Sequence, residues 1–202
     1  MALLAAGLSR ARRRGPRCGI VGPPAALFLL LGFGIGTAGA QVPASELEAG
    51  VKAAYLVNFT RYVEWPSSVV PDSEAPLMLC VAGLGTFRGI LDRVLAERRQ
   101  RGRVLQTRSV DSPSAADRCN LLYLPPDTPD EAEWLKAIRG RPVLSVGEGA
   151  QFVDRDGMIG FVIVNETVRF GINLTAARAA GLRISSRVLS LATRVQDEPG
   201  ER

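Results

Sequence analysis

The stretch FVIVNETVRFGINLTAARAAGLRISSRVLSLATRV, residues 161–195, carries the clearest structural signals of the sequence. It starts within a short apolar run, 160–164. Asn165 and Glu166 come next and can form a turn. Apolar residues then alternate with polar residues or glycine over 168–173, which is the period of a β-strand. These residues therefore predict a β-hairpin.

Helix signals follow the hairpin directly. Asn173 is a favourable N-cap for a helix over 174–180, and Gly181 suits the positive φ found after a helix C-terminus. Ser185 or Ser186 can cap a last helix, which we expect to lie against the sheet through one apolar face: Val188, Leu191, Ala192 and Val195.

Upstream, short apolar runs alternate with amphipathic segments. The predicted strands are 77–83, 104–110, 120–124 and 142–146, and the predicted helices are 51–65, 87–98 and 129–138. This alternation is typical of βαβ units with right-handed crossovers. We therefore predict an α/β protein with a single domain, built on a mostly parallel sheet that helices flank. The C-terminal hairpin is expected to add an antiparallel edge.

The first predicted helix carries an aromatic stripe. Val51, Tyr55, Phe59 and Tyr62 recur at spacings of three and four, and Pro66 ends the helical pattern. Packing of this stripe against the sheet is the preferred interpretation. A ligand platform is the alternative.

The first forty residues have the pattern of a secretory signal peptide. Five arginines within 10–17 precede an apolar run at 25–35, which is too short to span a bilayer, and Ala38-Gly39-Ala40 forms a small-residue cleavage site. Cleavage after Ala40 would release an exported protein, with a membrane anchor as the alternative. We expect a mature domain over 41–196 and a disordered tail over 197–202.

Cleavage changes the charge and cysteine arguments. The chain has 25 Lys plus Arg and 20 Asp plus Glu, so loss of the five arginines balances the charge. The high isoelectric point therefore does not indicate a nucleic-acid partner. Cys80 and Cys119 remain after Cys18 is removed, and an even pair in an exported protein predicts a disulfide. Two buried free thiols are the alternative.

Catalytic and metal-binding patterns are scarce. The sequence contains no histidine, which removes the commonest general base and the commonest transition-metal ligand. Asp154 and Asp156 favour a loop over a calcium site, and Gly83 and Gly85 favour a tight strand-to-helix turn over a phosphate site. We therefore expect no enzyme activity, no cofactor and no bound metal.

Four segments together resemble the YfiR family of periplasmic regulators. They are KAAYLVNFTRYVEWP (52–66), LCVAG (79–83), RCNLLYL (118–124) and VRFGINLTAARAAGLRISSRVLSLA (168–192), and they span nearly all of the mature chain in order. Well-known members carry a second disulfide towards the C-terminal half. No cysteine follows Cys119 here, so the resemblance does not extend to regulation through such a bond.

The resemblance implies a homodimeric periplasmic α/β protein that represses an inner-membrane diguanylate cyclase and so controls cyclic di-GMP signalling and biofilm regulation. A related membrane signalling protein, such as a histidine kinase, could take the place of the cyclase. It also implies an outer-membrane OmpA-like lipoprotein that sequesters the regulator. The alternative from another class is a small periplasmic ligand-binding protein that serves a membrane sensor or transporter.

Candidate binding residues cluster near the C-terminal motif and at the end of the first helix. Four of them could converge near one end of the sheet and bind a carboxylate or phosphate: Arg169, Asn173, Arg183 and Arg187. Arg61 and Glu64 form a second candidate partner surface. The alternative is an ordinary solvated face with surface arginines.

Overall fold

The computed structural model describes residues 44–71, 75–83, 85–97 and 104–197. The expected signal peptide and the tail beyond Asp197 lie outside these residues. The helices are α1 (Ala44–Tyr62), α2 (Phe87–Glu97), α3 (Glu131–Ile138), α4 (Gln151–Asp154), α5 (Leu174–Ala179) and α6 (Ser186–Leu189), with a 3-10 helix η1 (Pro113–Arg118). The strands are β1 (Val63–Glu64), β2 (Leu77–Ala82), β3 (Leu105–Val110), β4 (Leu121–Tyr123), β5 (Leu144–Glu148), β6 (Ile159–Val164), β7 (Thr167–Asn173), β8 (Arg183–Ile184) and β9 (Arg194–Gln196).

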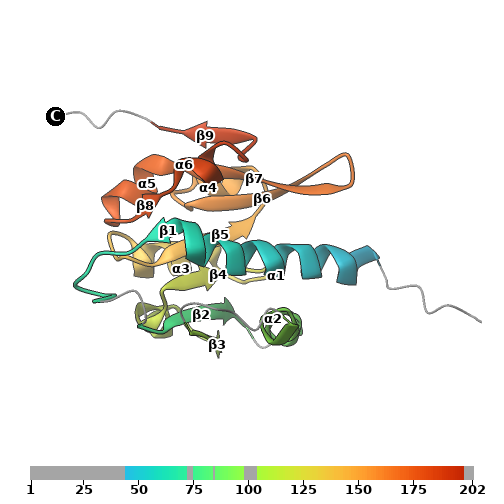
Figure 1. The fold of residues 1–202 in the computed structure, drawn as a ribbon, viewed down its shortest axis with the longest axis horizontal. Coiled ribbons are helices and arrows are strands. Elements are labelled where there is room, and N and C mark those ends of the chain that lie inside the picture. The colour runs from blue at the N-terminus through green and yellow to red at the C-terminus, as the bar shows by residue number, and fades with distance from the viewer. Residues whose placement is uncertain (1–43, 72–74, 84, 98–103, 198–202) are drawn as a thin grey trace, which may run out of the picture. The chain divides into compact units, whose positions relative to one another are not determined.

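A seven-stranded sheet in the order β3-β2-β4-β5-β6-β7-β9 forms the centre of the domain. The strands from β3 to β6 are parallel, and β7 pairs antiparallel with β6. The predicted α/β class, the single domain and the mostly parallel sheet are confirmed. The predicted hairpin forms as well, and it projects on the side where α1 begins (Figure 1).

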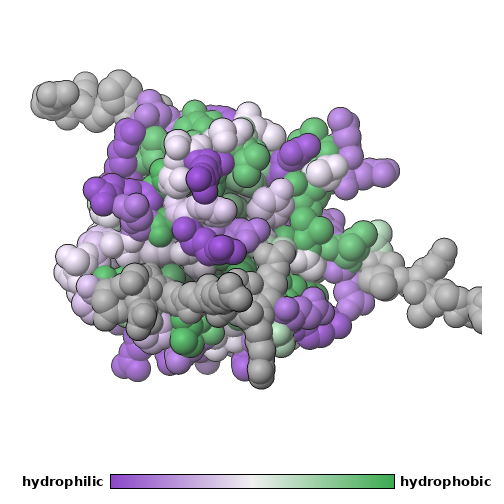
Figure 2. Space-filling model, in the orientation of Figure 1, coloured by the Kyte–Doolittle hydropathy of each residue, from purple (hydrophilic) through white to green (hydrophobic). Residues whose placement is uncertain are grey.

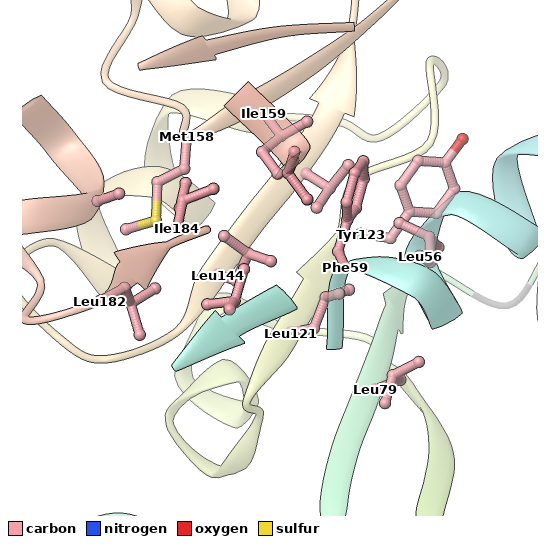
Figure 3. Packing of buried hydrophobic residues seen from close by; sticks show 14 of the residues in the cluster. Leu56, Phe59, Leu79, Leu121, Tyr123, Leu144, Met158, Ile159, Leu182 and Ile184 are labelled. Atoms are coloured by element: carbon pink, nitrogen blue, oxygen red, sulfur yellow. The ribbon is translucent and has the colours of Figure 1, made fainter. Parts of the chain in front are cut away.

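Helices cover both faces of this sheet. Alternate strand residues, such as Leu79 and Leu121, belong to one core cluster with α1 and α2, and Figure 3 shows this packing around Leu56 and Phe59. The intervening residues, such as Leu122, belong to a second cluster with η1, α3 and α4. Strands that are buried on both faces are apolar at nearly every position, which is why the sequence shows them as short apolar runs.

The predicted disulfide joins Cys80 of β2 to Cys119, the second residue before β4, with 5.8 Å between the Cα atoms. Both residues are buried, at 0% and 3% exposed. Because β2 and β4 are neighbours in the sheet, the bond lies beside a direct strand pair.

The first helix departs from its prediction at both ends. It begins at Ala44 and ends at Tyr62, and the next two residues, Val63 and Glu64, form β1. Val51 was expected in the core but is 38% exposed, whereas Leu56 is fully buried. The buried face is therefore rotated relative to the aromatic stripe, because α1 also packs against α2.

The C-terminal part of the chain shows the second departure. The last helix, α6, has four residues and ends at Leu189, and the chain then forms β9. Leu191 and Val195, expected on its buried face, are 61% and 41% exposed. β9 pairs parallel with β7, so the sheet edge is β9 and not the hairpin. Pairing with an available strand edge outweighs a weak local preference for helix.

A short antiparallel sheet of β1 and β8 lies outside the main sheet, with Val63 opposite Ile184 and Glu64 opposite Arg183. It links the end of α1 to the segment after α5. Next to it, the indole Nε1 of Trp65 donates to the Asn120 carbonyl at 3.2 Å, which anchors the Glu-Trp-Pro motif to the start of β4. Among the described residues, no helix combines the length and apolar character needed to cross a membrane.

Candidate functional site: a cleft at the strand ends and a surface ion pair

The carboxyl ends of β2 and β4 mark the point where the strand order reverses. From β2 the chain moves through α2 to β3 on one side, and then returns to β4 on the other side. In open α/β sheets, ligands bind in the crevice outside the strands at such a point. Here a cleft of about 360 Å³ lies at this position. Its lining includes Glu48, Lys52, Phe87, Tyr123, Asp127 and Thr128, and we refer to it as the switch-point cleft.

Lys52 of α1 is held at the inner wall of this cleft by two carboxylates. Its Nζ lies 2.8 Å from Glu148 Oε2 and 2.6 Å from Glu48 Oε1, and its side chain is only 9% exposed. The Tyr123 hydroxyl donates to Glu148 Oε1 at 2.5 Å. Glu148 therefore binds α1 and β4 at once from the end of β5.

Burial and charge shift the pKa values of this cluster. Burial by itself lowers the pKa of Lys52, but the hydrogen bonds and charges of Glu148 and Glu48 outweigh it, so the pKa is raised. Burial raises the pKa of Tyr123 far above its ordinary value, and the nearby carboxylates Glu148, Glu48 and Asp127 add to the effect. At neutral pH the cluster thus holds a charged ammonium and a neutral phenol.

Aromatic side chains connect the cleft to the core. The rings of Phe87 and Tyr123 are tilted at 41° with their centroids 4.4 Å apart. Tyr123 also meets Phe161 edge-on at 6.3 Å. Figure 3 shows the hydroxyl of Tyr123 at the margin of the apolar cluster, so the ring belongs to the core and the oxygen to the cleft.

Four of the residues predicted to bind a partner are grouped around the β1–β8 sheet. Arg183 donates two hydrogen bonds to Glu64 Oε2, at 3.0 Å from Nε and 2.8 Å from Nη2. Both side chains are open to solvent, at 82% and 68% exposed. Arg61 is exposed on the last turn of α1, and Arg187 is exposed on α6, whose cap residue Ser185 donates its N–H to Tyr62. We call Arg61, Glu64, Arg183 and Arg187 the Glu64–Arg183 patch.

The structure does not bring the other two predicted residues into this patch. Val168 and Phe170 face α1, so Arg169 and Asn173 lie on the opposite face of β7. Arg169 is exposed. Asn173 is 4% exposed and fulfils its predicted capping role, because its Oδ1 accepts from Ala176 N while its Nδ2 donates to the Val153 carbonyl. It also lines a second cavity, of about 300 Å³.

The Gly83 turn behaves as the sequence predicts. Gly83 has a φ of +80° and donates its N–H to the Val110 carbonyl, which fixes the turn after β2. Within the part of the chain that the structure describes, no group of three or more His, Cys, Asp or Glu is placed to hold a metal ion.

Sequence reasoning missed Lys52, Glu148 and Tyr123. One local signal was present, since Glu48 and Lys52 have the i, i+4 spacing of a helical ion pair. The predicted strand over 142–146 stops short of Glu148, which is the last residue of β5. The contacts of Lys52 and Tyr123 with Glu148 join segments that periodicity analysis treats separately.

Comparisons with known proteins give a family match and several structural likenesses. A family model described as YfiR/HmsC-like matches residues 49–193. The structure of a conserved domain protein from Vibrio cholerae O1 biovar El Tor has a TM-score of 0.51 at 14% identity, covering 71% of this chain and 60% of that protein. This likeness shows the fold, and this chain spans only about 60% of that protein's length.

Two other structures are less similar. An ABC domain in complex with L-Trp from a Streptococcus has a TM-score of 0.47 at 12% identity, with 73% of this chain and 60% of that one covered. The ligand-free, open form of a substrate-binding protein with adhesive properties from Clostridium difficile has a TM-score of 0.39 at 11% identity, with 65% and 57% covered.

Proposed function

This chain belongs to the YfiR/HmsC-like family of periplasmic regulators, and we propose that it binds the outer part of an inner-membrane diguanylate cyclase and holds that enzyme inactive. The family match over residues 49–193 is the observation that carries this proposal. Members of the family are regulators of diguanylate cyclases rather than enzymes. Accordingly, the proposed role is non-catalytic, and its output is the cellular level of cyclic di-GMP.

The proposal includes export and assembly. The signal peptide over residues 1–40 would be removed after Ala40, which delivers the domain over 41–196 to the periplasm. We propose that the protein acts as a homodimer and that an OmpA-like lipoprotein of the outer membrane relieves repression. A histidine kinase is the second kind of membrane partner. The balanced charge of the mature chain supports a protein partner over nucleic acid.

The Glu64–Arg183 patch is the proposed contact with the membrane protein. Arg183 donates two hydrogen bonds to one oxygen of Glu64 at the surface, and Arg61 and Arg187 add two further exposed guanidinium groups. Guanidinium groups bind carboxylates on a partner with defined geometry. Arg169, on the opposite face of β7, is a separate and second candidate contact.

Exposed apolar residues supply a complementary argument for a protein partner. Leu47 and Val51 near the start of α1 are 65% and 38% exposed, and Ile163 on the hairpin is 51% exposed. Figure 2 shows hydrophobic surface on the side of the view where α1 begins and the hairpin projects. Exposed apolar groups that gather on one side are typical of interaction surfaces.

A second candidate function is small-ligand binding in the service of a membrane sensor or transporter. The observation that favours it is the switch-point cleft, which lies where this sheet topology normally places ligands. The two functions are compatible if a ligand modulates the regulator.

Repression assays with charge-reversal variants test the proposed function. The protein and its cognate cyclase are expressed together, and cellular cyclic di-GMP is measured for Arg183→Glu, for Glu64→Arg with Arg183→Glu, and for Arg187→Ala and Arg169→Ala. We expect Arg183→Glu to release the cyclase. We also expect the double reversal not to restore repression. It rebuilds the ion pair, but position 183 then presents a carboxylate to the partner instead of a guanidinium.

The matched control is Arg139→Glu, which reverses one partner of another exposed ion pair, Arg139–Asp156 at 2.8 Å. Exposed pairs contribute about 1 kcal/mol or less, so all variants should fold, which a thermal melt checks. Full repression by the Arg183, Arg187 and Arg169 variants would reject both the Glu64–Arg183 patch and Arg169 as contacts with the cyclase. Restoration by the double reversal would show that the Glu64–Arg183 pair matters only for the structure.

A further inference from the structure

We propose that the switch-point cleft binds a small organic cation, in which an ammonium group is joined to an apolar or aromatic body. This inference goes beyond the regulation of a membrane partner and is independent of it, because the cleft belongs to one chain. Three properties carry it: the position of the cleft at the strand ends, its excess of negative charge, and an aromatic pair in its wall.

The charge balance favours a cation. The described lining of the cleft holds two carboxylates, Glu48 and Asp127, and Glu148 contacts the lining residues Lys52 and Tyr123. All three carboxylates act on the Tyr123 phenol. The ammonium of Lys52 forms ion pairs with Glu48 and Glu148. One positive charge does not balance three carboxylates, so Asp127 and the partly exposed Glu48 can bind another cation. Glu48 is 40% exposed and Asp127 is exposed, so a ligand can reach both.

The wall of the cleft favours an organic cation over a metal ion. Phe87 is partly buried, and its ring centroid lies 4.4 Å from that of Tyr123. Three prolines of the loop after β4 also line the cleft: Pro125, Pro126 and Pro129. An aromatic face attracts a desolvated cation by about 1 kcal/mol or more. The side chains of phenylalanine and proline offer no ligand atoms to a metal, whereas they can cover an alkyl or aryl group.

The same charges disfavour a phosphate at the Gly83 turn. The only ammonium in the lining is Lys52, among the residues the structure describes there, and its charge is already opposed by two carboxylates. A phosphate would therefore meet unbalanced negative charge. The glycines are explained by the turn, and the carboxylates favour a cation over an anion.

Titration calorimetry on the exported protein, purified from the periplasmic fraction, tests this inference. The probe is 2-phenylethylammonium, compared with its neutral analogue 2-phenylethanol and the anion phenylacetate. We expect the ammonium probe to bind at least about tenfold more tightly than either analogue, a difference of about 1.4 kcal/mol. Added salt should weaken it, because an exposed carboxylate contributes to binding.

Two substitutions locate the binding. Asp127→Asn should weaken binding of 2-phenylethylammonium about fivefold, whereas Asp117→Asn, at an exposed carboxylate on η1, should leave it unchanged. Gly85 lines the cleft and a Cβ there meets nothing within 4 Å, so Gly85→Leu adds an apolar side chain at the cleft wall and should weaken binding of the probe. Gly50→Leu, also in open space but on α1 outside the cleft lining, is its control.

Several results would overturn the inference. They are no binding of the ammonium probe, equal binding of the neutral or anionic analogue, and unchanged binding in both Asp127→Asn and Gly85→Leu. The assay uses the purified protein alone, so it can succeed or fail whatever the outcome of the cyclase assays.

Discussion

Lys52 Nζ lies 2.8 Å from Glu148 Oε2, although the two residues are 96 positions apart in the chain. The contact joins the first helix of the domain to the end of the central strand β5. Tyr123 binds the other carboxylate oxygen at 2.5 Å, so a single glutamate connects three elements at the carboxyl edge of the sheet. The position of α1 over the sheet therefore depends on a charged group as well as on apolar packing.

Substitution of Lys52 by methionine should destabilise the domain by about 3 kcal/mol, because it leaves the largely buried Glu148 carboxylate without its cation. Urea denaturation measures the effect. The control is Lys136→Met, which removes the exposed partner of Glu133 and should cost less than about 1 kcal/mol. Equal losses in the two variants would contradict a special role for Lys52.

Stability should fall at alkaline pH through Tyr123. The pKa of this phenol is raised in the folded protein from an ordinary value of 10.0, so the unfolded chain releases the proton first as the pH rises. The stabilisation is fully present below pH 10.0 and is lost above it. The raised pKa of Lys52 acts in the same direction.

Melting temperatures between about pH 8 and about pH 11 check this expectation. Tyr123→Phe should be less stable at neutral pH, because its hydrogen bond to Glu148 is lost, but its melting temperature should fall less steeply above pH 10.0. Tyr62→Phe, at the end of α1, is the control. A slope in Tyr123→Phe as steep as in the unsubstituted protein would contradict the assignment.

Loss of the disulfide should cost about 4 kcal/mol, the value that the chain-entropy model gives for a sequence separation of 39. Cys80→Ala with Cys119→Ala, compared with the unsubstituted protein in urea, measures it. Intact mass after alkylation provides a direct check, since no thiol should react before reduction and two should react after it. Two alkylated thiols before reduction would disprove the bond in the exported protein.

Gly147→Ala should destabilise the protein by about 2 kcal/mol, because the new Cβ would overlap the ring of Phe152. Gly89→Ala on α2 is the matched control, since a Cβ there meets nothing within 4 Å and alanine favours helix. Adding Phe152→Leu to Gly147→Ala should recover part of the loss. No difference between Gly147→Ala and Gly89→Ala would show that the ring can move away at little cost.

The fold could be predicted because its central strands are buried on both faces. Segments such as 77–82 are apolar at every position, and capping signals such as Asn173 and Gly181 mark helix ends by local chemistry. Prediction failed where tertiary contacts outweigh local preference. The predicted strand ends at residue 146, yet Gly147 also lies in β5 and makes room for Phe152.

The candidate site was less accessible to sequence reasoning. Arg183 and Arg187 are close in the sequence, and both are exposed as expected of surface arginines. The pairing of Arg183 with Glu64 depends on the β1–β8 register, which the sequence does not show. The Lys52–Glu148 contact has no local signature, because a lysine on a helix and a glutamate after a glycine are ordinary surface residues in a sequence. Only the sheet order brings their segments together.

The packing of α1 against late segments also determines when the domain can fold. Tyr55 meets Phe170 at 5.4 Å, and Glu64 binds Arg183 across 119 positions. During synthesis and export, α1 therefore emerges long before the strands that cover it. The core around α1 therefore cannot close until nearly all of the chain is available. Folding is therefore one late event for this chain, because its first helix has no complete partner until its last strands are available.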